Sequence, residues 1–516
     1  MEFGIDFGTT RTVVACADRG NHPVVGFQDG AGDTVQWIPT IVAERDGELR
    51  YGLDVDPSGG AHVVRSFKRW LSGAATPAQR VRIGSTEIAL ADLVAGFVSH
   101  VRDALVTRSD VRRGVASSMA KDGLRAAVAV PANSHSAQRL ITLDAFRRAG
   151  FDSVAMLNEP SAAGFEYTHR HRDTLSSKRD VVGVYDLGGG TFDASVVRMT
   201  GRRHEILATA GIARLGGDDF DMVLADVALA RAGIAREDLD TPDLERLLEH
   251  CRAAKEALNP ASRKVTIDLE AALGPRAPRT EVTVPVSDFY DACAPLVERT
   301  LETMTPLMSR MDDEALAPAL DDIAGIYVVG GASELPVIAR TLRQRFGRRV
   351  HRSPYPSAAV AIGLSIAADA GAGFELVDRY SRTFGVFREG EGGSEITFDP
   401  IFTPDTLLPQ ASSQRITETR AYRAAHNVGH FRFFECGAVD GAGRPRGDMT
   451  LYGDVYFPFD RALRSSGDLA DVRIERRPEE GPPVLERYSL DDSGIVEVVI
   501  QDVDSGYERV YRLARG

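Results

Sequence analysis

A short pattern of an aspartate followed by a glycine-threonine turn occurs twice in the chain, and the two aspartates, Asp6 and Asp186, are 180 residues apart. Ile5–Thr10 and Tyr185–Thr191 each combine the end of an apolar run, the aspartate, one apolar residue, glycine and threonine, and each precedes a second β-rich run. Internal repetition constrains a fold more strongly than a single motif does. The repeat predicts two related lobes whose turns face each other across a cleft.

The residue types in the two turns suit the binding of a phosphate chain. Glycine has no Cβ, so backbone amides can approach phosphate oxygens closely, and threonine hydroxyls add further donors. Asp6 and Asp186 are expected at strand ends facing the cleft, where they can hold a hydrated Mg²⁺, because this ion takes few carboxylates and keeps many waters. The turn residues expected to contact a nucleotide are Gly8, Thr9, Thr10, Gly188, Gly189 and Gly190.

Other common phosphate-binding motifs are missing from the sequence. There is no GxxxxGK[ST] loop, and no GxGxxG follows the first expected strand, so neither a P-loop enzyme nor a Rossmann dinucleotide site is expected. The net charge of −13 argues against nucleic acid and anionic membranes as partners. Only five of the 61 basic residues are lysines, which makes a lysine inside a motif more informative than usual.

The four cysteines, Cys16, Cys251, Cys293 and Cys436, are far apart and form no CxxC pair. This spacing predicts small buried thiols rather than a zinc site or a disulfide framework, and it fits a reducing compartment. The N-terminal residues lack the basic and apolar regions of a signal peptide, and no apolar run approaches the length of a membrane span. We therefore expect a cytoplasmic protein, and we expect it to be a monomer.

The first ~370 residues alternate short β-rich runs with longer helical stretches, which predicts an α/β domain. Strands are expected at Glu2–Asp6, Thr12–Ala17, Ala126–Val130, Val181–Asp186, Ala194–Met199 and Ile323–Val329. Helices are expected at Ser136–Ala149, Asp218–Ala232, Leu244–Ala257, Asp288–Met308, Leu335–Phe346 and Ser357–Ala370.

After Gly371–Asp378 the amino-acid composition of the chain changes. Glycine, proline, aromatic and β-branched residues dominate in short runs separated by turn signals such as Asp440-Gly441, which predicts an antiparallel β-sandwich. No long helix is expected after the last run. The runs expected to form strands include Glu395–Phe398, Gly429–Phe434, Met449–Phe457, Ile495–Val503 and Tyr507–Leu513.

Eight motifs occur in order along the first part of the chain: Gly4–Thr10, Phe67–Arg69, Val130–Ala132, Ala137–Arg139, Leu157–Ala163, Asp186–Asp193, Gly216–Asp221 and Val329–Ser333. In this order and spacing the chain resembles the 70-kDa heat-shock protein family, the DnaK-type molecular chaperones, over residues 1–370. Gly494–Glu497 and Ser505–Glu508 resemble the end of that family's substrate-binding β-sandwich. With no long helix expected behind them, the resemblance points to a variant without the family's helical lid.

The resemblance implies an actin-like fold of two lobes, each a copy of a βββαβα unit, followed by the antiparallel β-sandwich. On ATP binding the lobes would close, the linker would dock and the sandwich would loosen its grip on a client. Pro131 and Arg139 match a pair that signals nucleotide state in this family. The implied ATPase domain is 1–372, with lobe I about 1–178 and 352–372 and lobe II about 179–351, the linker is 373–378, and the substrate-binding-like domain is 379–516.

The resemblance also implies roles for individual residues. Lys68 and Glu159 would position the attacking water and stabilise charge on the γ-phosphate, which suits phosphoryl transfer because this reaction needs positioning and electrostatic stabilisation. Asp6 and Asp186 would hold Mg²⁺ through water, and Thr191 would lie near the γ-phosphate. The implied cofactors are ATP or ADP with Mg²⁺, and K⁺ is a further candidate. The remaining residues expected at the nucleotide are Asp193, Gly216, Gly217, Asp218, Lys255, Asn259, Gly330, Gly331 and Ala332.

Ordinary structural roles compete with these assignments. Lys68 could be a solvated surface lysine, and Lys255 could be an exposed helical residue. Glu159 precedes a proline, so it also fits a plain helix N-terminus, where acids are favoured. Phe431–Phe434 lies near the family's client groove, but a shift of one residue would reverse which side chains face inward, so we assign no client-binding residues.

The chain departs from the family where adenine is held. Glu334 and Glu256 stand where the family has cationic side chains, and Arg252 replaces a glutamate. A guanidinium stacks on a purine face and a carboxylate does not, so nucleotide affinity is expected to be weaker or adenine to be held differently. Ala155 stands where the family has an arginine that contacts J-domain co-chaperones, which argues against that contact and leaves other co-chaperones open.

These features favour an ATP-dependent, chaperone-like protein that couples slow hydrolysis of ATP, to ADP and phosphate, to the binding of unfolded or specific client polypeptides. The first alternative is an ATP-binding regulatory or scaffold protein with little or no hydrolysis, which Glu256 and Glu334 suggest. A sugar kinase would share the two phosphate turns but would lack Leu157–Ala163 and the C-terminal sandwich. Filament formation like that of actin would be obstructed by the sandwich.

Overall fold

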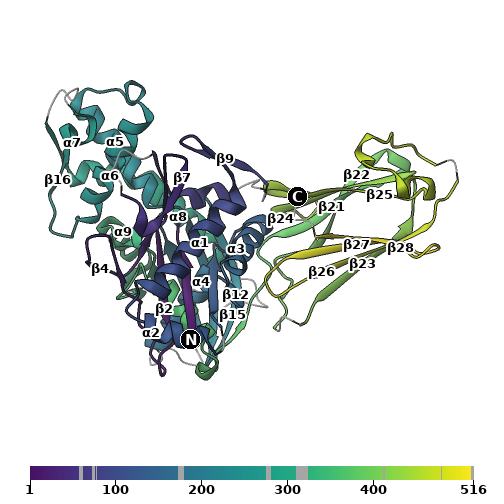
Figure 1. Cartoon of the computed structure of the whole chain (residues 1–516), viewed down its shortest axis with the longest axis horizontal. Coiled ribbons are helices and arrows are strands. Elements are labelled where there is room, and N and C mark those ends of the chain that lie inside the picture. Colours follow the sequence, from purple (N-terminus) through teal and green to yellow (C-terminus); the bar gives the residue numbers. More distant parts are fainter. Residues whose placement is uncertain are drawn as a thin grey trace.

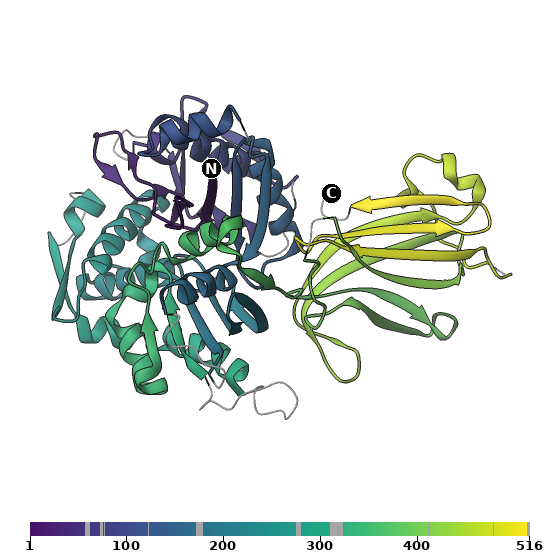
Figure 2. The same ribbon diagram turned by 90° about the horizontal axis from the view of Figure 1, so that it is seen from below.

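A computed structural model of the chain shows two parts, a larger α/β part with two lobes and a β module whose first strand begins at Thr383 (Figure 1). Figure 2 shows the same division from below. Within the residues that the structure describes, no helix is both long and apolar enough to cross a membrane. The described residues are 1–56, 62–72, 76, 78–121, 123–171, 179–274, 280–309, 323–410, 413–477 and 479–512.

Lobe I is built on a five-stranded sheet with the order β12-β11-β1-β2-β5. Its central strand β1 pairs parallel with β11 and antiparallel with β2, and both faces are covered, so the strands read as continuous apolar runs. The strands are β1 (Glu2–Phe7), β2 (Arg11–Cys16), β5 (Ile38–Pro39), β11 (Arg125–Val130) and β12 (Ser153–Asn158), and one face packs on α1 (Leu90–Thr107) and α3 (Ser136–Arg148).

Lobe II repeats this plan in a six-stranded sheet with the order β19-β18-β13-β14-β15-β20. Its central strand β13 pairs parallel with β18 and antiparallel with β14, as β1 pairs with β11 and β2. The predicted α/β fold of two duplicated lobes is therefore confirmed. The strands are β13 (Val181–Leu187), β14 (Phe192–Thr200), β15 (Arg203–Ile212), β18 (Ile323–Val329), β19 (Val350–Arg352) and β20 (Glu375–Val377).

Two helices, α4 (Glu159–Arg170) and α10 (Ala359–Ala368), pack against each other between the two sheets. Their backbones approach so closely that a Cβ added to Gly363 would lie 1.8 Å from the carbonyl oxygen of Ala162. A Cβ on Gly4 would lie 2.2 Å from the carbonyl oxygen of Ala361. Glycine is required at these contacts because any side chain would collide with backbone.

Smaller elements extend each lobe around the cleft. In lobe I a three-stranded sheet and the 3₁₀ helix η2 (Phe67–Leu71) carry Lys68 toward the cleft, and in lobe II α5 and α6 form the facing wall. These and the remaining elements are β3 (Phe27–Gln28), β4 (Thr34–Val35), β6 (Ile41–Arg45), β7 (Glu48–Tyr51), β8 (His62–Arg65), β9 (Arg80–Ile83), β10 (Thr86–Ala89), α2 (Arg112–Met119), α5 (Gly217–Ala232), α6 (Thr241–Glu256), β16 (Lys264–Asp268), α7 (Leu269–Leu273), β17 (Glu281–Pro285), α8 (Val286–Ser309) and α9 (Pro336–Phe346).

The β module consists of two antiparallel sheets, with the orders β22-β21-β24-β25 and β23-β26-β27-β28. Phe384 and Phe433 of one sheet and Tyr488 of the other are fully buried and pack ring against ring, so an aromatic core joins the sheets. This confirms the predicted sandwich. The strands are β21 (Thr383–Gly390), β22 (Glu395–Phe402), β23 (Ile416–Arg423), β24 (Val428–Val439), β25 (Pro445–Pro458), β26 (Pro483–Leu490), β27 (Val496–Asp502) and β28 (Tyr507–Arg512).

Several element ends differ from the sequence-based expectations. The helix expected from Leu244 begins at Thr241, because the Asp240 side chain accepts a hydrogen bond from the backbone N–H of Asp243 and caps an earlier start. The helix expected from Ser357 begins at Ala359. Leu513, expected in the last strand, lies outside the described residues.

The expected linker, 373–378, is not a free connector. Glu375–Val377 forms β20, which pairs parallel with β15, and the ring of Phe374 lies 5.4 Å from that of Phe165. All four cysteines are buried and free, as predicted. The ends of the domains remain predictions.

The close packing of α4 and α10 can be tested by a pair of glycine substitutions. Gly363→Ala is expected to lower the free energy of unfolding by about 3 kcal/mol, because its Cβ would collide with the carbonyl of Ala162. Gly164→Ala, in α4, should change it by less than about 1 kcal/mol, since the nearest atom is the flexible end of Met199, 3.3 Å away. Denaturant unfolding of both variants measures the difference. Equal effects would contradict the packing.

Candidate functional site

The two predicted turns meet at a cavity of about 940 Å³ between the lobes. A Cβ added to Gly189, in the turn of lobe II, would lie 2.5 Å from Thr10 Oγ1 in the turn of lobe I. Asp6 and Asp186 both line the cavity. The structure therefore brings the two halves of the repeat face to face, and the contact explains why glycine occupies the turn.

Most of the predicted site residues lie on the wall of this cavity. Gly190, Asp193 and Gly216 lie just behind it, where a Cβ on Gly190 would meet Thr9 and one on Gly216 would meet the backbone of Gly190. The predicted residues on the wall are Asp6, Gly8, Thr9, Thr10, Lys68, Glu159, Asp186, Gly188, Gly189, Thr191, Gly217, Asp218, Lys255, Asn259, Gly330, Gly331 and Ala332.

Three aspartates, Asp6, Asp186 and Asp193, lie close together where the two turns meet, on β1, β13 and β14. Burial raises the pKa of Asp6 to about 7 and that of Asp193 to about 8, and the negative charge of Glu159 is the second cause in both cases. The pKa of Asp186 is also well above its ordinary value, first through burial and then through Glu159. Lys68 lowers all three pKa values, but it is a single positive charge among four acids.

Lys68 and Glu159 form a buried ion pair at this end of the cavity. The Nζ of Lys68 donates to Glu159 Oε1 at 3.1 Å, and the two side chains are 5% and 10% exposed. Lys68 is therefore no solvated surface residue. Glu159 is the first residue of α4, so the helix N-terminus that the sequence also suggested is present, and it places the carboxylate in the site.

The crowded carboxylates fit a bound cation. Their pKa values are raised first by burial and then by the neighbouring acids, and a divalent ion would stabilise the ionised carboxylates. Among the described residues no group of three or more His, Cys, Asp or Glu side chains is arranged to ligate a metal directly. Asp6 and Asp186 would hold Mg²⁺ through water, as this strongly hydrated ion prefers.

The opposite end of the cavity has a charge arrangement that the sequence did not reveal. Glu256 accepts from Arg11 Nη2 at 2.5 Å, and Glu334 lies 3.7 Å from Arg352. Both acids are thus paired with arginines. The guanidinium of Arg340, also on the cavity wall, lies over the ring of Tyr290, 5.5 Å from its centroid.

Lys255, predicted to lie at the nucleotide, is on the cavity wall and is engaged by protein partners. Its Nζ lies 2.6 Å from Asp221 Oδ1 and donates to the carbonyl of Gly217 at 2.8 Å, and the side chain is only 8% exposed. Arg252 likewise binds Asp218 at 3.0 Å, so two predicted nucleotide contacts, Lys255 and Asp218, are engaged by protein partners. Lys255 is not an exposed helical residue either.

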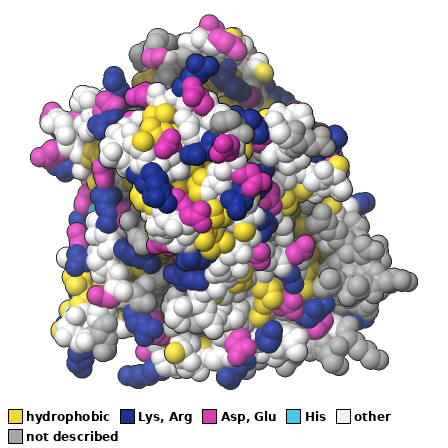
Figure 3. All heavy atoms as spheres, turned by 90° about the vertical axis from the view of Figure 1, so that its right-hand side faces the viewer, with side chains coloured by type: hydrophobic (Ala, Val, Ile, Leu, Met, Phe, Trp, Pro, Cys, Tyr) yellow, Lys and Arg dark blue, Asp and Glu magenta, His cyan; other side chains and the backbone are white. Residues whose placement is uncertain are grey.

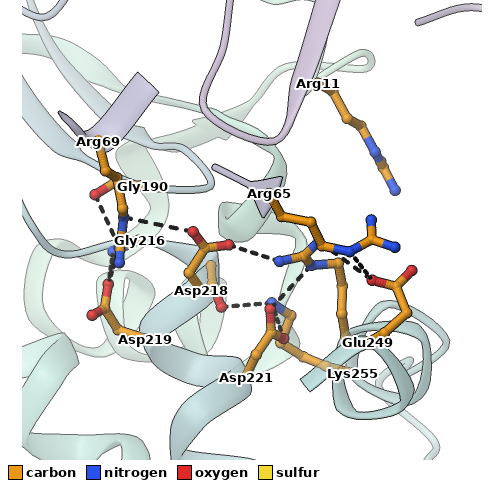
Figure 4. Close-up of polar contacts among 12 residues, drawn as sticks. Arg11, Arg65, Arg69, Gly190, Gly216, Asp218, Asp219, Asp221, Glu249 and Lys255 are labelled. Carbon is orange, nitrogen blue, oxygen red and sulfur yellow. Dashed lines mark hydrogen bonds and ion pairs between the residues drawn. The ribbon is translucent and has the colours of Figure 1, made fainter. Parts of the chain in front are cut away.

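Arginines of lobe I reach acids of lobe II across the cleft, as Figure 4 shows. Arg69 Nη2 donates to Asp219 Oδ2 at 2.5 Å, and Arg65 Nε lies 3.3 Å from Glu249 Oε2. Sequence reasoning did not identify these arginines as site residues. Arg69 directly follows Lys68 in one of the eight motifs, which was the only available signal.

The α/β part contacts the β module through the N-terminus of α3. Glu435 of β24 is 2% exposed and accepts from the backbone N–H of Ser136 at 3.0 Å and from its hydroxyl at 2.5 Å. Arg139 donates to Asn158 Oδ1 at 2.5 Å and to the carbonyl of Ser493 at 3.3 Å. The first of these contacts caps the helix with a carboxylate, which its dipole favours.

Comparison with known proteins identifies the family of this chain. A family profile described as Hsp70 protein matches residues 107–428, more than half of the chain. The chain belongs to the Hsp70 family. It is 34% identical over 437 residues to a protein of Burkholderia multivorans (strain ATCC 17616 / 249) named Chaperone protein HscA homolog, an alignment that covers 81% of this chain and 66% of the relative.

Other relatives carry the same name. Proteins of Burkholderia cenocepacia (strain HI2424) and Burkholderia pseudomallei (strain 668) are 34% and 33% identical over 437 residues, again covering 81% of this chain and 66% of the relative. The chain thus spans slightly less than two thirds of the length of these Hsp70-family relatives. The suspected resemblance to the 70-kDa heat-shock proteins is confirmed.

The raised pKa values predict that cation binding depends on pH. Asp6, with a pKa of about 7, and Asp193, with a pKa of about 8, are protonated below these values and attract a cation only when they are ionised. The affinity for Mg²⁺-ADP should therefore rise by about tenfold between about pH 6 and 8, with protons released on binding. Calorimetry in two buffers of different ionisation enthalpy measures both effects.

ADP without Mg²⁺ is the matched control for this prediction. Its affinity should fall as the pH rises, because ionised carboxylates repel its phosphates. An affinity for Mg²⁺-ADP that is independent of pH, or proton uptake on binding, would contradict the site.

Proposed function

We propose that this Hsp70-family protein binds Mg²⁺-ATP between its lobes, hydrolyses it slowly to ADP and phosphate, and couples the nucleotide cycle to the grip of the β module on client polypeptides. The observation that carries the proposal is the buried Lys68–Glu159 pair, which faces Asp6 and Asp186 at the meeting point of the two glycine turns. The name chaperone on its relatives supports the same function.

The chemistry follows from the positions of these groups. The amides and hydroxyls of the two turns would hold the phosphate chain, with Thr191 near the γ-phosphate. Lys68 would neutralise charge that develops on the transferred group, and Glu159 would orient the attacking water. Bound Mg²⁺ would supply electrophilic polarisation of the phosphate oxygens. A mainly positioning role for every side chain agrees with a slow reaction.

A short path leads from this site to the β module. Asp193 Oδ1 accepts from the backbone N–H of Ala132 at 2.9 Å. The next residue, Asn133, accepts from Arg382 of the β module at 3.0 Å. A shift of Asp193 on nucleotide binding would therefore move the very segment that carries the interface, which supports coupling between the two parts.

The proposed partners are client polypeptides. Co-chaperones remain candidates. Ala155, on β12, stands where the family has an arginine that contacts J-domain proteins, which argues against that one contact. We propose a monomer in the cytoplasm, with no nucleic-acid or membrane partner, consistent with the net charge of −13. K⁺ stays a candidate cofactor beside Mg²⁺.

A second candidate function is an ATP-binding regulatory protein with little or no hydrolysis. It is favoured by the base end of the cavity, where Lys255 is engaged by Asp221 and where Glu256 is bound to Arg11. A nucleotide held weakly there could still act as a conformational ligand.

Single-turnover hydrolysis of ATP distinguishes the two functions. Lys68→Met is expected to lower the rate by about a hundredfold, because it removes the one buried positive charge beside Glu159. Lys121→Met, at an exposed position, is the matched control and should retain the wild-type rate. Equal, near-zero rates for the wild type and both variants would leave the regulatory function.

Coupling is tested by measuring ATP affinity with and without a permanently unfolded protein, reduced and carboxymethylated α-lactalbumin. Each ligand should weaken binding of the other, by the same factor. Glu435→Ala should abolish this mutual effect, because it removes the buried acceptor for Ser136. Glu418→Ala, on exposed strand β23, should preserve it. Independent binding in the wild type would contradict coupling.

A further inference from the structure

The cavity between the lobes continues past the residues expected at the nucleotide and follows one side of α9. Residues of a helix that are three and four positions apart share one face, and eight residues of helix span about 12 Å. The cavity therefore extends along two turns of α9, beyond Gly330 and Gly331. The residues of α9 on the cavity wall have this spacing and are Pro336, Ala339, Arg340, Arg343 and Gln344.

Apolar and aromatic groups also line this extension of the cavity. Tyr290 of α8 and Leu258, which follows α6, are on its wall, and α8 packs beside α9 (Figure 1). The guanidinium of Arg340 lies over the Tyr290 ring, 5.5 Å from the ring centroid. A cation in this position is attracted to the face of the ring. The contact therefore holds the exposed side chain of Arg340 at the edge of the cavity.

Arg340 and Arg343 are two like charges one helix turn apart. Within the part of the chain that the structure describes, neither guanidinium forms an ion pair with a carboxylate. Like charges on neighbouring turns of one helix face repel each other. An anion bound between the two arginines would remove this repulsion.

The acids at this end of the cavity already have arginine partners. Glu256 is bound by Arg11, and Glu334 lies 3.7 Å from Arg352. Charges of both signs are interspersed elsewhere on the surface, as on the face that Figure 3 shows. The two arginines of α9 thus remain an unbalanced positive charge, in a protein whose net charge is −13.

A phosphate group is the anion that fits two arginines best. Each guanidinium offers a planar fork of donors that matches two phosphate oxygens, and two guanidinium charges balance one doubly charged phosphate. A nucleotide with its 5′-phosphates at the two glycine turns would have its ribose and base toward Gly330 and Gly331, just before α9. A further phosphate carried on the ribose could extend from there along α9.

We propose that Arg340 and Arg343 form an anion-binding subsite that selects nucleotides with a phosphate group on the ribose in addition to the 5′-phosphates. This inference rests on the proposed function, in which the cavity holds a nucleotide, and it names a class of nucleotide that the cavity favours. Such a nucleotide occupies the place of ATP. It therefore competes with ATP and slows the hydrolysis cycle.

The test is calorimetry of the full chain with Mg²⁺ and three ligands: ADP, ADP with an added 2′-phosphate and ADP with an added 3′-phosphate. The two isomers place the added group on different sides of the ribose. One of them should bind about tenfold more tightly than ADP, because its phosphate gains charge-assisted hydrogen bonds to the arginines. Affinities of both isomers that equal that of ADP or are weaker would overturn the proposal.

Variants on α9 locate the subsite. Arg343→Gln should reduce the gain from the added phosphate to about twofold, and Arg343→Lys should give an intermediate gain because lysine keeps the charge without the fork of donors. Arg345→Gln is the matched control and should keep the full gain, since Arg345 is an exposed arginine of the same helix that is not on the cavity wall. An equal loss in Arg345→Gln and Arg343→Gln would show general attraction to a basic helix and would overturn the subsite.

The same titrations separate a failure of the subsite from a failure of the proposed function. If ADP itself does not bind, the proposed function is contradicted and the subsite fails with it. If ADP binds but neither added phosphate improves its affinity, only the subsite is overturned.

Discussion

The meeting of four acids around a single lysine, at the point where two glycine turns touch, is the constraint on which the rest of this structure depends. Burying several carboxylates together is costly, and their raised pKa values express that cost. The acids come from β1, β13, β14 and the start of α4, so no single element could assemble the cluster. The duplicated fold brings it together, and a cation with its phosphates would stabilise it.

Two kinds of contact join the lobes around this cluster, close backbone packing and ion pairs. Helices α4 and α10 are joined by backbone contacts that only glycine permits, and such contacts fix the geometry between the sheets. Across the open side of the cleft the lobes are joined by charged pairs such as Arg69–Asp219 and Arg65–Glu249. Partly exposed ion pairs are weak and easily broken. The arrangement suits lobes that pivot on a rigid crossing and open at the mouth.

Much of this architecture could be predicted from the sequence, since the forces behind it leave local patterns. The repeated turn is visible because the close contact of Gly189 and Gly190 with the side chains of Thr10 and Thr9 leaves no room for a Cβ. The sandwich is visible because turns and alternating strands recur. The motif around Lys68 predicted a role in the site, and the buried position of its side chain excludes the alternative of a surface lysine. Both interpretations of Glu159, as a site residue and as a helix N-terminal residue, are correct. Glu159 is the first residue of α4, and this position places its carboxylate in the site.

The features that the sequence did not predict depend on pairs of residues that are distant in the chain. Arg11 and Glu256 are 245 residues apart, and Lys255 meets Asp221 on another helix, so no pattern around either residue reveals these pairs. Strand β20 lies inside the expected linker, 373–378, and its three residues are too few to show the periodicity of a strand.

The central claim is that Asp6 and Asp186, from the two halves of the repeat, hold one hydrated cation together with a nucleotide. A crystal of the chain grown with Mn²⁺ and ADP tests it directly, because the anomalous signal of manganese locates the ion. We predict one peak between the two turns, about 4 Å from both carboxylates, as expected for contact through water. A manganese ion bound by one lobe alone, or a nucleotide seated elsewhere in the molecule, would contradict it.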